Sequence, residues 1–250
     1  MRKLIIVGSI IQTRKNAPLT YSPTRTAFSD EERLRHTVYS ISALRDRHPD
    51  TDIVLVDASD DPKDYRQIFA FLNVVYVWLQ DISTETANIV RTHPNKSVCE
   101  VLLLNTYIKA NKAKIKTYDY IIKGTGRYSL MNFDNSLFTP ENTDKIFFKK
   151  PFEYEWNDAW RYSFVDKRSE QGDNKLRQYC TVVFGFGIEH LDKFIDMFDV
   201  IGDLLQNDSM KHYDIETLIY YFTRFFTDKI IETDWRVLGW DGVTNRLMYY

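Results

Sequence analysis

The sequence predicts an α/β protein with a Rossmann-like, mostly parallel central sheet flanked by helices. Two observations predict this class. Short apolar runs alternate with helical segments through the first 80 residues or so, an order that favours parallel strands joined by right-handed crossovers. The 250 residues are 44% hydrophobic, which is enough for one substantial core. We therefore expect a single domain over residues 1–250.

The first part of the chain supplies three of the expected strands and two helices. Ser29 is a strong N-cap candidate because Glu32 occupies the capping-box position three residues later. His48 and Pro49 stop the helix that follows. The expected elements are a strand at 4–11, a helix from 30 to about 47, a strand at 52–56, a short helix at 63–71 and a strand at 73–79.

The loop after the first strand is longer than most connections between a strand and its helix, which suggests a binding role. In an open α/β sheet, ligands bind beyond the carboxyl ends of the strands, where this loop begins. Its polar residues Thr13, Arg14 and Arg25 are candidates for binding a ligand, as is Asp57 after the second strand. The Gly-x-Gly-x-x-Gly fingerprint is missing, which argues against an NAD or FAD enzyme.

The middle of the chain carries the residues best suited to an anion. Residues 81–94 look polar and irregular, and Asn95 or Ser97 then caps a largely buried helix. Lys96 in its first turn opposes the helix dipole, so either Glu100 or an incoming phosphate is expected nearby.

A fourth strand at 118–123 ends at Lys123 and runs into a Gly-Thr-Gly-Arg-Tyr turn. Gly126 allows close backbone approach to a ligand, and Arg127 offers a planar fork for phosphate or carboxylate; a plain turn with a surface arginine is the alternative.

The second half of the chain is rich in aromatic and charged residues. A segment with Trp160 either offers a stacking surface or forms a hairpin layer over the sheet. A β-rich run at 180–187 and an amphipathic helix at 188–205 follow. After His212 comes a helix start, in which Asp214 is a sensible N-cap and Glu216 favours the dipole. The C-terminal tail with Trp240 either closes over a site or packs as a terminal hairpin.

Charge and cysteine usage restrict the class of partner. The formal charge is −2, from 33 basic and 35 acidic residues, so no global field draws the chain to nucleic acid or a membrane surface. The first apolar run is too short for a signal peptide, and no run reaches the length of a membrane span. Cys99 and Cys180 are far apart in the sequence, as expected of buried thiols in a reducing compartment. We expect a cytoplasmic protein, in the host cytoplasm if the source is a virus.

Four segments together resemble a known family. YSPTRTAFSDEER, NKSVCE, KGTGRYSLMNFD and DIETLIYYF are similar, in this order, to little-characterised glycosyltransferase-like proteins of bacteria, phages and large DNA viruses. The resemblance covers most of the chain. It implies a GT-A type fold, with a nucleotide-sugar-binding half at 1–135 and an acceptor-binding half at 136–250. It also implies transfer of a sugar from a UDP- or GDP-linked donor to a glycan or other hydroxyl acceptor.

The resemblance also suggests roles for particular residues. Inverting GT-A enzymes commonly place an acidic base where Glu216 stands, with Asp214 as the second choice, and such a base takes the acceptor's proton. The donor would be bound by Thr13, Arg14, Arg25, Asp57, Lys96, Lys123, Gly126 and Arg127. The acceptor would be bound by Trp160, His212 and Trp240.

One departure from the GT-A pattern concerns the metal. These enzymes usually carry Asp-x-Asp at the end of the fourth strand, where this chain has Gly126-Arg127-Tyr128. Either Asp134 or Asp57 holds Mn²⁺ or Mg²⁺ in another way, or cations such as Arg127 neutralise the diphosphate directly. Two other functions stay open, which are a non-catalytic carbohydrate-binding or assembly protein and, lower in rank, a sugar nucleotidyltransferase.

Overall fold

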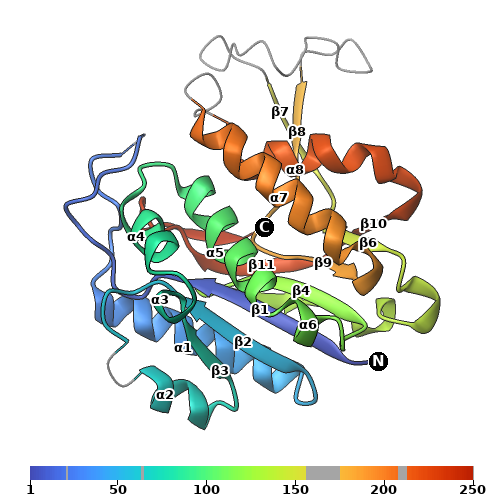
Figure 1. Cartoon of the computed structure of the whole chain (residues 1–250), viewed down its shortest axis with the longest axis horizontal. Helices are drawn as coiled ribbons and strands as arrows, with labels where there is room; N and C mark the ends of the chain where they lie inside the picture. Colours follow the sequence, from blue (N-terminus) through green and yellow to red (C-terminus); the bar gives the residue numbers. More distant parts are fainter. Residues whose placement is uncertain (21, 63–64, 156–174, 208–212, 250) are drawn as a thin grey trace.

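The computed structural model describes residues 1–20, 22–62, 65–155, 175–207 and 213–249. A seven-stranded sheet in the order β10-β6-β9-β4-β1-β2-β3 runs through the molecule (Figure 1). β1 pairs in parallel with both β2 and β4, and β9 is antiparallel to β4 and β6. The predicted α/β class with a mostly parallel sheet is confirmed. The strands are β1 (Lys3–Ser9), β2 (Asp52–Asp57), β3 (Val75–Trp78), β4 (Tyr120–Thr125), β6 (Ile146–Lys149), β9 (Phe184–Gly187) and β10 (Ile230–Thr233).

Helices cover both faces of this sheet (Figure 1). Ile5 and Val7 of β1 belong to a core cluster with α1 and α2, whereas Leu4 and Ile6 pack with α4, α5, α7 and α8. Successive side chains of one strand thus enter opposite cores, which explains why the strand is apolar throughout. The longer helices are α1 (Asp30–Arg47), α2 (Tyr65–Phe71), α4 (Thr84–Thr92), α5 (Lys96–Ala110), α7 (Leu191–Gln206) and α8 (Ile215–Thr223); α3 (Leu79–Ile82) and α6 (Lys112–Ile115) are single turns.

Two small sheets complete the fold. β5 (Tyr128–Asn132) leaves β4 through a tight turn and pairs with β11 (Arg236–Trp240), which forms a hairpin with β12 (Leu247–Tyr249). β7 (Phe152–Glu155) and β8 (Lys175–Gln178) form a separate two-stranded ribbon. Because Gly239 of β11 lies opposite Tyr128, the C-terminal hairpin lies directly beside the turn between β4 and β5.

The predicted helix starts at Ser29, Asn95 and Asp214 are confirmed by their hydrogen bonds. The Ser29 side chain accepts from the Glu32 backbone, and the Glu32 carboxylate accepts from the Ser29 backbone at 2.8 Å. Asn95 accepts from Ser97 N at 2.8 Å, and Asp214 accepts from Thr217 N at 2.7 Å. The starts of α5 and α8 also meet, since Ile215 N donates to Ser97 Oγ at 3.1 Å.

The expectation of an irregular segment at 81–94 is wrong. This stretch ends α3 and forms α4, whose N-cap Ser83 accepts from Thr86 N at 3.2 Å. Ala87 and Val90, three residues apart, are fully buried, which is the spacing of one helix face. The polar residues around them hid this short apolar stripe. None of the described helices is both long enough and apolar enough to cross a membrane.

Candidate functional site

A cavity of about 140 Å³ opens where β1 and β4 end. Its lining includes Ser9 of β1, Thr125 of β4 and Gly126 in the turn that follows. The first turns of α5 line it too, and the first loop contributes Thr13 and Arg25. This is the edge of the sheet at which open α/β folds bind ligands. Strand order and the position of α5 therefore bring together residues that are more than 100 positions apart in sequence.

The cavity is strongly cationic. Its described lining contains five basic side chains, Arg25, Arg33, Lys96, Lys123 and Arg127, but one carboxylate, Glu100. Glu100 is itself bound by Lys123 in an ion pair. The carboxylates that act on Lys96 and Arg33, which are Asp241 for the lysine and Asp57 and Asp30 for the arginine, are not lining residues. Positive charge therefore dominates the described lining, which is the pattern expected around a polyanionic ligand.

Two of these cations are held by backbone carbonyls. Arg25 is 4% exposed and donates to His93 O at 2.9 Å and Val90 O at 3.0 Å. Arg33 is 7% exposed and donates from Nε to Ile10 O at 2.8 Å. Burial and the nearby Arg127 charge lower the pKa of Arg33 to about 9. Carbonyl dipoles orient a guanidinium but leave its net charge, so an anion in the cavity would stabilise both arginines.

Lys96 shares this environment at the N-terminus of α5. Burial, followed by the Arg127 charge, lowers the pKa of Lys96 to about 8, although the Asp241 charge opposes the shift. The helix dipole adds positive potential at the same place. Glu100, one of the two partners expected for Lys96, forms an ion pair with Lys123.

Lys123 is buried at the end of β4 and connects the cavity to α8. Its ammonium donates to Thr125 Oγ1 at 3.0 Å and to the carbonyl of Thr181. The hydroxyl of Thr181 in turn donates to Glu216 Oε1 at 2.7 Å. Glu216 is absent from the described lining of the cavity, but Thr181 links it to Lys123, and the charge of Glu100 reaches it.

The carboxyl groups at the start of α8 hold protons tightly. Burial, followed by the charges of Asp214 and Glu100, raises the pKa of Glu216 to about 8. Burial also raises the pKa of Asp214, whose carboxylate caps the helix. A carboxyl that titrates near neutral pH next to a cationic cavity is a candidate acid or base.

Thr13 has a buried hydroxyl oxygen at the first-loop side of the cavity. Within the described residues, Thr13 Oγ1 has no hydrogen-bond partner. A buried hydroxyl without a partner costs free energy, which a ligand in the cavity would recover.

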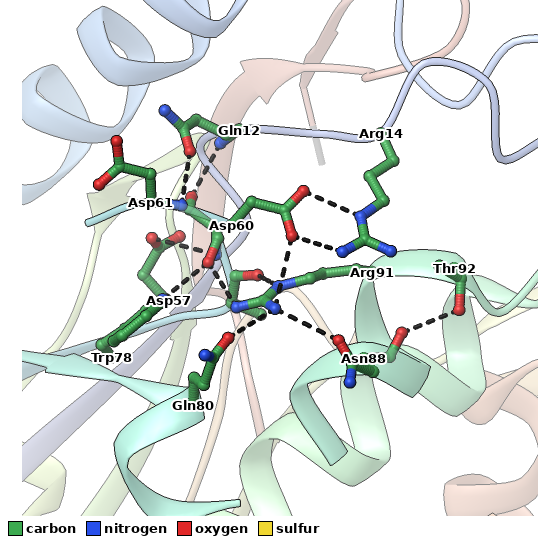
Figure 2. A network of polar contacts seen from close by, with 12 residues as sticks. Gln12, Arg14, Asp57, Asp60, Asp61, Trp78, Gln80, Asn88, Arg91 and Thr92 are labelled. Atoms are coloured by element: carbon green, nitrogen blue, oxygen red, sulfur yellow. Dashed lines mark hydrogen bonds and ion pairs between the residues drawn. The ribbon is translucent and has the colours of Figure 1, made fainter. Parts of the chain in front are cut away.

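Arg14 and Asp57, which we predicted to bind the donor, belong to a network of polar contacts (Figure 2). Arg14 binds Asp60 through two hydrogen bonds of 2.9 and 2.6 Å, and Arg91 lies 3.4 Å from the same carboxylate. Asp57 accepts from Ile11 N at 3.0 Å and from the Tyr76 hydroxyl at 2.7 Å. These contacts tie the first loop to the exit of β2 and to α4. Neither Arg14 nor Asp57 is among the described lining residues.

A second cavity, of about 320 Å³, lies on the other side of Arg127 between α1 and β11. Trp240 lines it and stacks on His36 at a centroid distance of 6.0 Å. Tyr39, 69% exposed, adds another aromatic side chain. The other two predicted acceptor residues, Trp160 and His212, lie outside the described part of the chain.

Comparison with known proteins defines the fold more closely. The glycosyltransferase GlyE of Streptococcus pneumoniae TIGR4 superposes with a TM-score of 0.50 at 10% identity, over 93% of this chain. The fold is that of the GT-A glycosyltransferases. This chain spans 45% of the GlyE chain.

Two further GT-A neighbours superpose less closely. Galactosyltransferase LgtC, in complex with donor and acceptor sugar analogues, gives a TM-score of 0.46 at 10% identity, covering 93% of this chain and 73% of its own. A glycosyltransferase involved in glycosylating the major capsid of PBCV-1 gives 0.42 at 10% identity, covering 94% and 82%. No family model and no curated protein sequence matches this chain.

The described residues do not fit the divalent metal of GT-A enzymes. Arg127 occupies the turn where Asp-x-Asp is expected, and Asp57 is engaged in internal hydrogen bonds. Asp134 accepts from Ser136 N at 2.8 Å and borders a different hollow, with Asp234 and Trp235. Among the described residues, no three His, Cys, Asp or Glu side chains converge as metal ligands. The positive charge along the described lining of the cavity comes from arginine and lysine side chains.

Proposed function

We propose that this protein is a glycosyltransferase that transfers a sugar from a UDP- or GDP-linked donor to a hydroxyl group of a glycan acceptor. The observation that carries the proposal is the cationic cavity at the carboxyl ends of β1 and β4. A nucleotide-sugar carries a diphosphate, which is an anion for which arginine forks and a helix N-terminus are well suited.

In this proposal, Arg127, Lys96, Arg25 and Arg33 surround the diphosphate. Their charges stabilise the negative charge that develops on the departing nucleotide as the bond to the sugar breaks. The Thr13 hydroxyl donates a hydrogen bond to the donor, and Gly126 lets the backbone approach it. Lys123, already paired with Glu100, links the cavity through Thr181 to Glu216.

Glu216 is the proposed base of a direct, inverting displacement. The acceptor oxygen forms a bond with the anomeric carbon, the bond from that carbon to the diphosphate breaks, and the acceptor's proton passes to Glu216. A pKa of about 8 makes the ionised carboxylate a stronger base than an ordinary glutamate, and this ionised form becomes the major one only above about pH 8. Asp214, the helix cap, is the second choice.

In this proposal, the two halves of the chain bind different substrates. The cavity's described lining comes from residues 1–135, whereas Glu216 and Trp240 come from 136–250. We propose that the second half binds the acceptor, with Trp240 stacking against a sugar ring. Trp160 and His212 stay predicted acceptor residues.

Calorimetry with UDP and GDP, each in EDTA and in Mn²⁺, tests the proposal. We expect one nucleotide to bind in EDTA, and Arg127→Ala to weaken it about tenfold, the effect of losing roughly one charge-assisted hydrogen bond. Hydrolysis of the matching nucleotide-sugar then tests catalysis. Failure of both nucleotides to bind in either buffer would overturn the proposal, and binding without turnover would favour a non-catalytic carbohydrate-binding protein.

A further inference from the structure

The guanidinium of Arg127 contacts the turn between β11 and β12. Its Nη1 donates to Trp240 O at 3.0 Å, at the end of β11. Arg127 also lowers the pKa of Lys96, Arg33 and His36 through its charge. The side chain thus stands between the cationic cavity and the second cavity, and it lines both of them.

Gly242 leaves the space that this guanidinium occupies. A Cβ built on Gly242 would lie 2.8 Å from Cζ and 3.0 Å from Nη2 of Arg127, and closer still to Nη1. These are the three heavy atoms nearest to such a Cβ. The backbone of Gly242 has no left-handed φ, so its conformation would accept alanine. The missing side chain therefore makes room for Arg127 and is not required by the turn.

The turn itself is held rigidly. The Asp241 carboxylate accepts from Val243 N at 2.9 Å, from Thr244 N at 2.6 Å and from the Thr244 hydroxyl at 2.8 Å. Ala27 N donates to Gly242 O at 2.8 Å, which fixes the turn against the first loop two residues after Arg25. A rigid wall on one side gives a long arginine side chain a defined position, at a lower entropic cost on binding.

We propose that the turn at residues 241–244 is a positioning element of the anion site, in which Gly242 and the Trp240 carbonyl seat the Arg127 guanidinium toward the ligand's phosphates. This inference depends on one part of the proposed function, which is that the cavity binds a diphosphate. It assigns to the C-terminal hairpin a part in donor binding that is separate from any contact with the acceptor.

A double-mutant cycle tests this inference, with inorganic pyrophosphate as the probe because it does not depend on the identity of the nucleotide. Gly242→Ala should weaken pyrophosphate binding about tenfold, as should Arg127→Ala, since each removes roughly one charge-assisted hydrogen bond. The double variant should bind no more weakly than Arg127→Ala alone. Gly242→Ala should stay folded, because the displaced group is the end of a flexible side chain.

Gly202→Ala in α7 is the matched control. Its new Cβ would meet Val101 at 3.5 Å, an ordinary contact, so its pyrophosphate affinity should equal that of the wild type. Unchanged binding in Gly242→Ala, or losses that add in the double variant, would overturn the positioning role while leaving the proposed function intact. If the wild type binds neither pyrophosphate nor UDP and GDP, the proposed function fails with it.

Discussion

The raised pKa of Glu216 contributes a decrease in the stability of the fold as the pH increases, and Glu216→Gln should remove that contribution. Burial and two neighbouring carboxylates raise this pKa from 4.5 to about 8. Between these values the native state keeps a proton that the unfolded state has released, so the free energy of unfolding falls as the pH rises. The full loss is at most about 5 kcal/mol, because each tenfold change in proton affinity is worth about 1.4 kcal/mol.

Urea denaturation at pH 6 and pH 9 measures the effect. Between pH 6 and pH 9, the contribution of Glu216 to the free energy of unfolding of the wild type should fall by about 2–3 kcal/mol. This fall should be missing in Glu216→Gln. Glutamine keeps the oxygen that accepts from Thr181 and carries no charge. Glu189→Gln, at an exposed position before α7, is the control and should behave as the wild type. Parallel losses in the wild type and Glu216→Gln would show that Glu216 is ionised in the fold, contrary to the reasoning.

Three further variants test local features by urea denaturation. Lys123→Met should lower the free energy of unfolding by about 2 kcal/mol. This is less than breaking a fully buried ion pair costs, because the side chain of the partner Glu100 is 32% exposed. An effect no larger than that of Lys114→Met, on the surface, would refute this. Ser29→Ala should cost about 1 kcal/mol by removing the capping box, and an unchanged midpoint would contradict it. Phe198→Ala, fully buried in α7, should cost about 3–5 kcal/mol; a loss below 1 kcal/mol would show that α7 is loosely packed.

Features set by neighbouring residues could be predicted from the sequence. The capping box at Ser29 and the caps at Asn95 and Asp214 depend on side chains three or fewer positions away, and all three form. The alternation of strands and helices in the first 80 residues likewise predicted the parallel half of the sheet. The helix at 84–92 was missed because its apolar stripe is only two buried residues among polar ones.

Features that depend on distant contacts could not be predicted in this way. Arg33 lines the cavity because α1 packs beside the end of β1, and the sequence shows only a basic residue after a cap. Glu100 binds Lys123 across the boundary between a helix and a strand. The contacts of Arg14 with Asp60 and of Asp57 with Tyr76 were likewise not predicted. Which charged residues form ion pairs depends on how close they lie in the folded protein. The spacing of these residues in the sequence does not reveal that distance.

The insertion of β9 between β4 and β6 affects the risk that the chain aggregates during synthesis. Ile121 and Ile122 of β4 are buried in the finished protein, yet the outer edge of that strand stays without its partner until Phe184 has been made. An apolar strand with an open edge recruits other chains. Nascent chains stalled within this interval of about 60 residues should aggregate or engage chaperones, whereas chains released after β9 should not.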